Sequence, residues 1–287
     1  MSAGLQGSTA HYVAVGHVTV DVLEDGERRP GGTVLYSALQ AARLGLQATI
    51  VTRGEPSELR ALLEPFAEEV ELLIEPAVAT TTLGTEGSGS TRRQHMLAWA
   101  GPVDLDALPS TGILHLAPVA AELHGTVRGD WEFVGITPQG MTRRWEDMGG
   151  LIGSSECDPA LLTLAGRCDA LVLSELERRN CTSLLERALA GGATAAVTAG
   201  PGTTEILLPN GGSLDVAVDP VERPADDLGA GDVYAAAFFT RLATGAGARE
   251  AARTASAAAA LRMSGIGPAA IAGAETIERY AARAGLS

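Results

Sequence analysis

The chain contains no lysine, so all 21 of its basic side chains are arginine. Without lysine it cannot form a Walker A phosphate loop, a lysine Schiff base of the pyridoxal phosphate or class I aldolase type, or the strand lysine of a protein kinase. A polyanionic ligand would therefore need a local anion hole of backbone groups or a metal ion.

Aromatic residues and cysteines are also scarce. Aromatic residues make up only 4% of a chain that is 46% apolar, so small aliphatic side chains must fill the core, which favours an α/β layered fold. The three cysteines, Cys157, Cys168 and Cys181, lie more than ten residues apart, which fits neither a zinc pattern nor a disulfide framework. We expect them to be reduced core thiols, and the five histidines share no metal-binding spacing.

The charge pattern excludes further classes of protein. The net charge is −14, with acidic residues spread along the chain, whereas a nucleic-acid surface needs clustered cations. Residues 1–10 are small and polar, lack a positively charged start, and precede no apolar run long enough to cross a bilayer. We therefore expect a disordered N-terminal segment over 1–10 and a cytoplasmic protein that binds neither nucleic acid nor membrane.

Short apolar runs alternate with helical patterns along most of the chain. The pattern predicts a mainly parallel sheet with helices on both faces. The predicted strands cover Tyr12–Gly16, Ala48–Thr52, Ile113–Leu116, Glu132–Ile136, Ala170–Leu173 and Ala195–Val197. The predicted helices cover Val34–Gly45, Glu177–Ala190, Val233–Thr244, Arg249–Met263 and Ala274–Ala284.

Two segments do not fit this alternation. Val18–Leu23 and the pair of segments that flank GSGS, TTTLGTE and TRRQHMLAWA, have the character of additional strands. They predict a lid, with strands near residues 17–33 and 79–100, inserted into a single domain over 11–287. The lid would place four polar side chains over the crevice at the carboxyl ends of the parallel strands: Asp21, Arg92, Arg93 and Gln94.

The segment DDLGAGDVYAAAFFTRLATG, from Asp226 to Gly245, carries the most specific chemistry. Its turn Gly229-Ala230-Gly231 leads directly into a helix, so backbone N–H groups can converge on a phosphate at the positive helix end. Asp232 falls in the first helical turn, within reach of a hydroxyl that would attack a phosphoryl group. The alternative is a plain tight turn followed by an acid that favours the helix dipole.

These residues resemble the ribokinase (PfkB) family of carbohydrate kinases, whose signature reads approximately D-T-T-G-A-G-D. Asp226, Gly229, Ala230, Gly231 and Asp232 match it, while Asp227 and Leu228 stand where threonines are usual. The resemblance implies a ribokinase-like three-layer α/β/α sandwich with a small β-sheet lid, and ATP and Mg²⁺ as donor and cofactor. It also implies Asp232 as base, the glycine turn as anion hole, and Asp226 at the metal.

The likeness extends to the start of the chain. Gly16 and Asp21 resemble the family's G-x-x-x-x-D, and Gly31 and Gly32 its di-glycine, which implies that Asp21 and the glycines contact acceptor hydroxyls. A carboxylate accepts two hydrogen bonds, and glycine permits close backbone approach. A capped turn would explain the same residues.

Three further segments match family motifs. Ser174 to Glu177 resembles N-x-x-E, which implies Glu177 near the magnesium ion, although an acid at a helix start needs no such role. The nucleotide site is implied for Thr198 and Gly200, in a T-x-G turn, and for Ala258 and Gly265 beside the adenine. A β-turn and a packed helix are the alternative.

The segment TPQGMTRRW, Thr137–Trp145, resembles a branch that includes myo-inositol kinase-like proteins. The resemblance implies that Gln139 and Arg144, with Arg93 from the lid, bind a polyhydroxylated ring, whereas a surface loop with solvated arginines is the alternative. The overall prediction is an ATP-dependent kinase that phosphorylates a sugar or cyclitol.

Two other functions remain open at this point. A nucleoside kinase on the same scaffold would want aromatic side chains to stack on the base, for which only Tyr36 and Trp99 are candidates. A non-catalytic ligand-binding relative would explain why Ser174, Asp227 and Leu228 depart from the family. A homodimer through the lid is a further expectation, since exposed strand edges often pair with a second copy.

Overall fold

The computed structural model describes residues 10–109, 112–200, 202–217 and 221–283. Residues 1–9 of the segment expected to be disordered lie outside this range. No helix within it is both long and apolar enough to cross a membrane.

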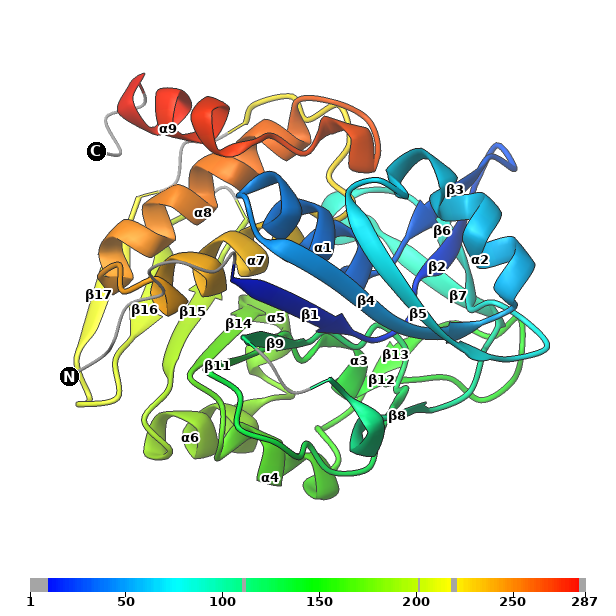
Figure 1. Cartoon of the computed structure of the whole chain (residues 1–287), viewed down its shortest axis with the longest axis horizontal. Coiled ribbons are helices and arrows are strands. Elements are labelled where there is room, and N and C mark those ends of the chain that lie inside the picture. Colours follow the sequence, from blue (N-terminus) through cyan, green and yellow to red (C-terminus); the bar gives the residue numbers. More distant parts are fainter. Residues whose placement is uncertain (1–9, 110–111, 201, 218–220, 284–287) are drawn as a thin grey trace.

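A nine-stranded sheet forms the centre of the molecule (Figure 1). Its strands run in parallel from β5 to β15, and β16 and β17 add an antiparallel edge. In spatial order they are β17 (Ser213–Val216), β16 (Thr204–Leu207), β15 (Thr194–Thr198), β14 (Ala170–Ser174), β11 (Phe133–Ile136), β9 (Ile113–Leu116), β1 (His11–Val15), β4 (Gln47–Gly54) and β5 (Val70–Pro76). The predicted parallel sheet is confirmed.

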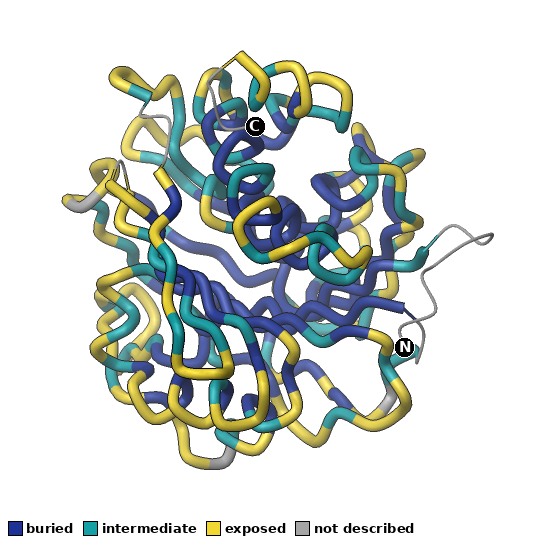
Figure 2. The backbone as a smooth tube through the Cα atoms, turned by 90° about the vertical axis from the view of Figure 1, so that its left-hand side faces the viewer, coloured by how far each residue is buried: buried dark blue, intermediate teal, exposed yellow. Residues whose placement is uncertain are grey.

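Helices cover both faces of this sheet, so the architecture is the predicted α/β/α sandwich (Figure 1). One apolar core contains buried residues of α1, α2, α7, α8 and α9, and the other contains buried residues of α3, α4 and α6, whereas α5 has no buried residue. The helices are α1 (Thr33–Arg43), α2 (Pro56–Leu63), α3 (Gln139–Thr142), α4 (Leu162–Ala165), α5 (Glu175–Arg178), α6 (Thr182–Ala190), α7 (Ala230–Ala243), α8 (Ala248–Met263) and α9 (Ala274–Arg283). Figure 2 shows that burial is greatest in the strands and in the helices directly over them.

The predicted helix Glu177–Ala190 is wrong in one respect, because two helices replace it. Ser174 and Glu177 close a capping box that starts α5, and Asn180 then bonds back to the carbonyl of Glu177. Cys181 leaves the helical conformation, with φ −115°, and acts as N-cap of α6. The capping box thus fixes where Glu177 points.

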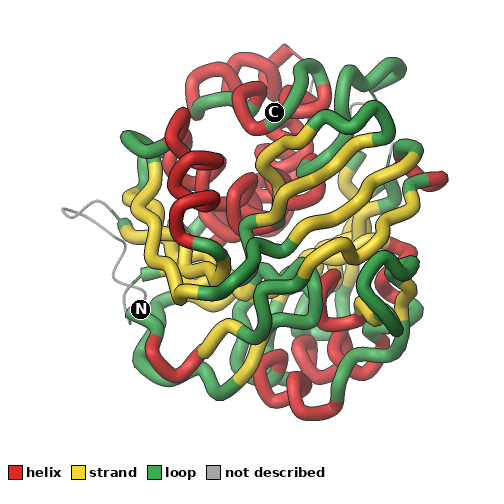
Figure 3. The backbone as a smooth tube through the Cα atoms, turned by 90° about the vertical axis from the view of Figure 1, so that its right-hand side faces the viewer, coloured by secondary structure: helices red, strands yellow, loops and turns green. Residues whose placement is uncertain are grey.

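Four strands form a separate lid sheet in the order β3 (Arg28–Gly31), β2 (Thr19–Leu23), β6 (Thr82–Glu86) and β7 (Arg93–Ala98). Figure 3 shows the side of the molecule on which the lid lies, next to the carboxyl ends of the central strands. The segment 149–154 extends the lid along β7, where Met96 N–H bonds Gly150 and Ile152 N–H bonds Gln94.

Two small strand pairs and several 3₁₀ turns complete the described elements. The pairs are β8 (Val103–Asp104) with β10 (Leu123–His124) and β12 (Arg143–Arg144) with β13 (Gly153–Ser154). The second pair ties the loop after β11 to the lid extension.

Candidate active site

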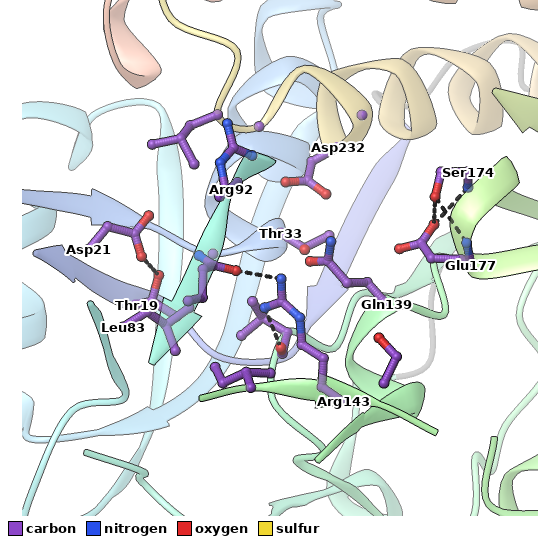
Figure 4. A pocket seen from close by; sticks show the side chains of 18 of the residues that line it. Thr19, Asp21, Thr33, Leu83, Arg92, Gln139, Arg143, Ser174, Glu177 and Asp232 are labelled. Atoms are coloured by element: carbon purple, nitrogen blue, oxygen red, sulfur yellow. Dashed lines mark hydrogen bonds between the residues drawn. The ribbon is translucent and has the colours of Figure 1, made fainter. Parts of the chain in front are cut away.

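A pocket of about 460 Å³ lies between the lid and the carboxyl ends of the central strands. Side chains from the lid, from the starts of α1, α5 and α7, and from the segment after β11 all reach it (Figure 4). The sequence-predicted residues that line it are Asp21, Gly32, Arg92, Arg93, Gln94, Gln139, Glu177, Gly229, Gly231 and Asp232. Residues more than 200 positions apart in the chain thus meet in one cavity.

The glycine turn before α7 presents free backbone donors to this pocket. Gly229 is in the left-handed conformation, with φ 76°, and a Cβ atom there would lie 2.3 Å from the ring of Tyr36. Ala230 N–H bonds Asp227 and Val233 N–H bonds Gly229, but the N–H groups of Gly231 and Asp232 have no acceptor among the described residues. A Cβ atom on Gly231 would meet only open space. Free N–H groups at a helix start beside an open volume are suited to an anion.

Asp232 lies in the first turn of α7 with its carboxylate directed into the pocket (Figure 4). Burial raises the pKa of this carboxyl from 3.8 to about 6, the hydroxyl of Thr33 and the Arg143 guanidinium lower the pKa, and the charge of Glu177 raises it. Ser37 donates a hydrogen bond of 3.3 Å to the backbone carbonyl of Asp232, which ties α1 to the start of α7. Helix α1 thus holds the backbone of Asp232 in place through Ser37.

Asp21 and the two glycines meet on the lid side of the pocket. A Cβ atom on Gly31 would lie 2.2 Å from the Asp21 carboxylate, and one on Gly32 would lie 2.3 Å from the His17 carbonyl. Thr19 donates a hydrogen bond of 3.0 Å to Asp21, and burial raises the pKa of Asp21 to about 6. The close approach predicted for these glycines is therefore to the protein's own lid residues.

Glu177 uses one of its carboxylate oxygens in the capping box. Oε2 accepts hydrogen bonds of 2.7 Å from Ser174 N–H and 2.9 Å from the Ser174 hydroxyl. Glu177 also lines the pocket, so Oε1 is the oxygen that is free to face a ligand there (Figure 4). The helix-start role and a ligand role are therefore compatible.

Asp226 is not among the residues that line the pocket, although the family resemblance implies that it lies at a metal. Its carboxylate accepts hydrogen bonds of 2.8 Å from Arg262, 2.9 Å from Gly267 N–H and 3.0 Å from Leu228 N–H. Arg262 is fully buried and its guanidinium lies 5.1 Å from the centre of the Tyr36 ring. The structure uses Asp226 to hold the loop that leads into the glycine turn.

The arginine that enters the pocket from the segment after β11 is Arg143. Its guanidinium donates 2.9 Å to the Val119 carbonyl and 2.6 Å to Gln94 Oε1, which joins the TRRQ segment of the lid to TPQGMTRRW. Arg144 is exposed and bonds only nearby backbone carbonyls among the described residues. The sequence prediction missed Arg143 because successive side chains of a strand point to opposite sides, and β12 offered two arginines without a burial pattern.

The four residues predicted at the nucleotide do not line this pocket. Thr198 ends β15, Gly200 is an exposed turn residue with φ 60°, Ala258 is buried in α8, and Gly265 follows α8. Across the described ranges, no three His, Cys, Asp or Glu side chains form a group that could hold a metal ion. The predicted reduced core thiols are confirmed, since all three cysteines are free and buried.

Part of the chain matches the model of a known protein family. Residues 154–274, which include Glu177, the glycine turn and Asp232, match the model of the pfkB family carbohydrate kinases. A search of curated protein sequences gives no match.

Solved structures share the fold over nearly the whole chain. A pyrophosphate-dependent kinase of the ribokinase family, in complex with a pyrophosphate analogue and myo-inositol, is 18% identical with a TM-score of 0.73, over 90% of this chain and 96% of that one. Fructokinase from Vibrio cholerae O395 is 19% identical with a TM-score of 0.74, over 95% and 99% of the two chains.

A nucleoside kinase from Methanocaldococcus jannaschii is 15% identical with a TM-score of 0.72, over 96% of this chain and 99% of that one. These likenesses establish the ribokinase-like fold. The match to the family model confirms the resemblance to the pfkB carbohydrate kinases and supports a phosphotransferase that acts on hydroxyl groups.

Proposed function

We propose that the protein is an ATP-dependent kinase that transfers the γ-phosphoryl group to a hydroxyl of a small polyhydroxylated acceptor, a sugar or a cyclitol. One observation carries the proposal. The Asp232 carboxylate opens into the same pocket as Asp21, and so do the N–H groups of Gly231 and Asp232, which have no acceptor in the described part of the chain. A base, an anion hole and a hydroxyl-binding carboxylate are therefore in reach of one small ligand.

The reaction follows from these positions. The acceptor oxygen forms a bond to the γ-phosphorus while the bond from that phosphorus to the bridging oxygen breaks, and the leaving diphosphate keeps the electron pair. The acceptor proton passes to the Asp232 carboxylate. The N–H groups of Gly231 and Asp232 bind the oxygens of the transferring group, where charge must be stabilised in a loose transition state.

The residues at the pocket fit a magnesium ion that is shared with the donor. Mg²⁺ in kinases takes one or two carboxylates and several oxygens from phosphates and water, and Glu177 Oε1 is free to act directly or through water. Asp226 would act only through the loop that it holds. When bound, the ion neutralises phosphate charge.

The acceptor end of the pocket favours a ring that carries several hydroxyls. Asp21, Gln139 and Arg143 offer carboxylate, amide and guanidinium groups to it, with Arg93 at its edge. Trp99 packs against Trp145 and donates its N–H to Ala120, and the Tyr36 ring is covered by Gly229 and Arg262. Neither aromatic ring is free to stack on a base, which favours a sugar or cyclitol over a nucleoside.

The donor is proposed as ATP, with its nucleoside beyond the glycine turn near Thr198, Gly200, Ala258 and Gly265. The likeness to a pyrophosphate-dependent kinase gives the test a second donor, inorganic pyrophosphate. Turnover should be measured with Mg²⁺ and each donor against sugars, cyclitols and nucleosides. Turnover of one acceptor class establishes the kinase and names its substrate. Binding of a donor without turnover on any acceptor favours the non-catalytic relative.

The pH dependence provides a separate test of the base. Because Asp232 must be ionised to accept a proton and burial raises its pKa to about 6, kcat/KM should rise with pH and level off above about 6. Below that pH it should fall about tenfold per unit. A profile that stays flat from pH 5 to pH 8 would contradict the assignment of Asp232 as base.

We also propose that the protein forms a homodimer through the lid. The edge strand β3 carries Arg28, Arg29 and Pro30, which disfavour edge-to-edge pairing. The outer face of the lid is the better candidate, because Leu97 on β7 is 43% exposed there. Light scattering at micromolar concentration should give twice the chain mass of 29.4 kDa. The Leu97→Arg variant should give the mass of a single chain. A monomeric wild type would contradict the proposal.

A further inference from the structure

The tip of the lid hairpin is bound directly to the loop that forms the glycine turn. Arg92 forms an ion pair with Asp227, and Gly89 N–H donates a hydrogen bond of 2.9 Å to the other oxygen of the same carboxylate. Gly89 and Arg92 belong to the turn between β6 and β7, while Asp227 lies two residues before Gly229. The lid and the loop of the glycine turn therefore meet at the Asp227 carboxylate.

Arg92 keeps an unused donor at this point. Its Nε atom is buried and has no hydrogen-bond partner among the described residues, whereas its Nη2 atom is paired with Asp227. A guanidinium presents its N–H groups in a rigid fork, so one edge can bind a carboxylate while the other binds a phosphate oxygen. A buried donor without an acceptor is costly unless a ligand supplies one.

The position of Arg92 indicates which ligand would accept the hydrogen bond from its Nε–H. Arg92 lines the pocket together with Gly229, Gly231 and Asp232, and Figure 4 shows it between Asp21 and the start of α7. Its positive charge also lowers the pKa of Asp21 on the acceptor side. The cation thus lies between the acceptor end and the anion hole, where a phosphoryl group in transfer would lie.

Arg143 also reaches into the pocket, but it is tied to the acceptor side. Its two Nη atoms each donate one hydrogen bond, to the Val119 carbonyl and to Gln94. The chain has no lysine, and Arg92 is the pocket arginine that binds the loop of the glycine turn directly, through Asp227.

We propose that Arg92 is the residue of the lid that binds the transferring phosphoryl group, through Nε–H, and that Asp227 is the positioning residue that holds its guanidinium there. This inference rests on the proposed function and names a further residue of the same site. It gives the departure at Asp227 from the family signature a role, because the acidic side chain replaces threonine at the contact that orients the arginine.

A double-mutant cycle separates this role from simple charge neutralisation. Arg92→Gln should lower kcat/KM for the donor by about 10²-fold or more, as removal of an arginine from a phosphoryl group does. Asp227→Asn should lower it less, since the cation stays but loses its orientation. The double variant should remain as slow as Arg92→Gln, because the contact to phosphate is absent in both. Recovery of the double variant to the level of Asp227→Asn would overturn the inference, since Arg92 would then only neutralise Asp227.

Arg28→Gln is the matched control, because Arg28 lies on the same lid sheet, pairs with Glu58 and is 55% exposed outside the pocket. It should keep wild-type kinetics. Calorimetric binding of ATP, and separately of inorganic pyrophosphate, to wild type and Arg92→Gln tests the contact without turnover. We expect at least a tenfold loss of affinity for the phosphate ligand that binds. Equal affinity and equal kcat/KM overturn the inference alone, whereas a wild type that neither binds nor turns over either donor overturns the proposed function as well.

Discussion

Asp232→Asn is expected to lower kcat by at least about 10²-fold and, at the same time, to stabilise the fold. The activity falls because the amide cannot accept the acceptor proton. The fold gains because the native protein holds this carboxylate in a pocket where burial raises its pKa from 3.8 to about 6. Donor binding should persist, since the backbone of the glycine turn is unchanged.

The stability gain has a defined pH dependence. A carboxyl whose pKa is higher in the folded than in the unfolded protein binds protons preferentially in the folded state. Ionisation of Asp232 therefore weakens the fold progressively as pH rises from about 4 to about 6. We expect a gain on the order of 1–3 kcal/mol above pH 6, because a one-unit shift corresponds to about 1.4 kcal/mol and the side chain keeps some solvent contact.

Thermal unfolding of wild type and Asp232→Asn across pH measures this gain. The difference in Tm should be largest near pH 8 and should shrink as pH falls through 6. Asp147→Asn, which removes an exposed carboxylate outside the pocket, should change neither kcat nor the pH dependence of Tm. Unchanged turnover in Asp232→Asn would mean that Asp232 does not act as the base.

Local sequence signals determined most of the fold and part of the site. The strand Ile113–Leu116 was predicted at its observed bounds, because a short apolar run between turn residues is a local property. The start of α7 was predicted within three residues, at Val233 where the structure has Ala230, because the glycines, the helix and Asp232 are consecutive in the chain.

The contacts that complete the site carry no such signal. Arg92 meets Asp227 across 135 positions, and Asp226 meets Arg262 across 36. Nothing in the residues around either arginine specifies a carboxylate so distant, because both partners are common surface types. The choice between Arg143 and its neighbour likewise depends on the twist of a two-residue strand against the lid.

These distant contacts hold the loop of the glycine turn from two sides. The lid reaches the turn from one side through Asp227, and α8 reaches it from the other through Asp226. The lid contact is partly exposed, with both side chains 24% accessible. The α8 contact is more deeply buried, with Arg262 0% and Asp226 10% accessible, so disturbing it should affect stability as well as catalysis.

Arg262→Met is expected to lower the free energy of unfolding by about 3–5 kcal/mol, because it leaves the Asp226 carboxylate buried without its cation. The wild-type guanidinium is fully buried, bonds Asp226 at 2.8 Å and the Gly265 carbonyl at 3.0 Å, and covers Tyr36. Loss of this support frees Tyr36 and the Gly229 turn above it, so KM for the donor should rise. Chemical denaturation and donor kinetics measure the two effects.

The second substitution Asp226→Asn, made in the Arg262→Met background, identifies the cause. It removes the unpaired charge, so part of the lost stability should return, but the donor KM should stay high because nothing then ties the loop to α8. Arg262→Lys should fall between wild type and Arg262→Met, since an ammonium keeps the charge but cannot reach the carboxylate and the carbonyl with one planar fork. An Arg262→Met variant as stable as wild type would mean that the carboxylate finds water or another donor, and that the buried pair does not support the anion hole.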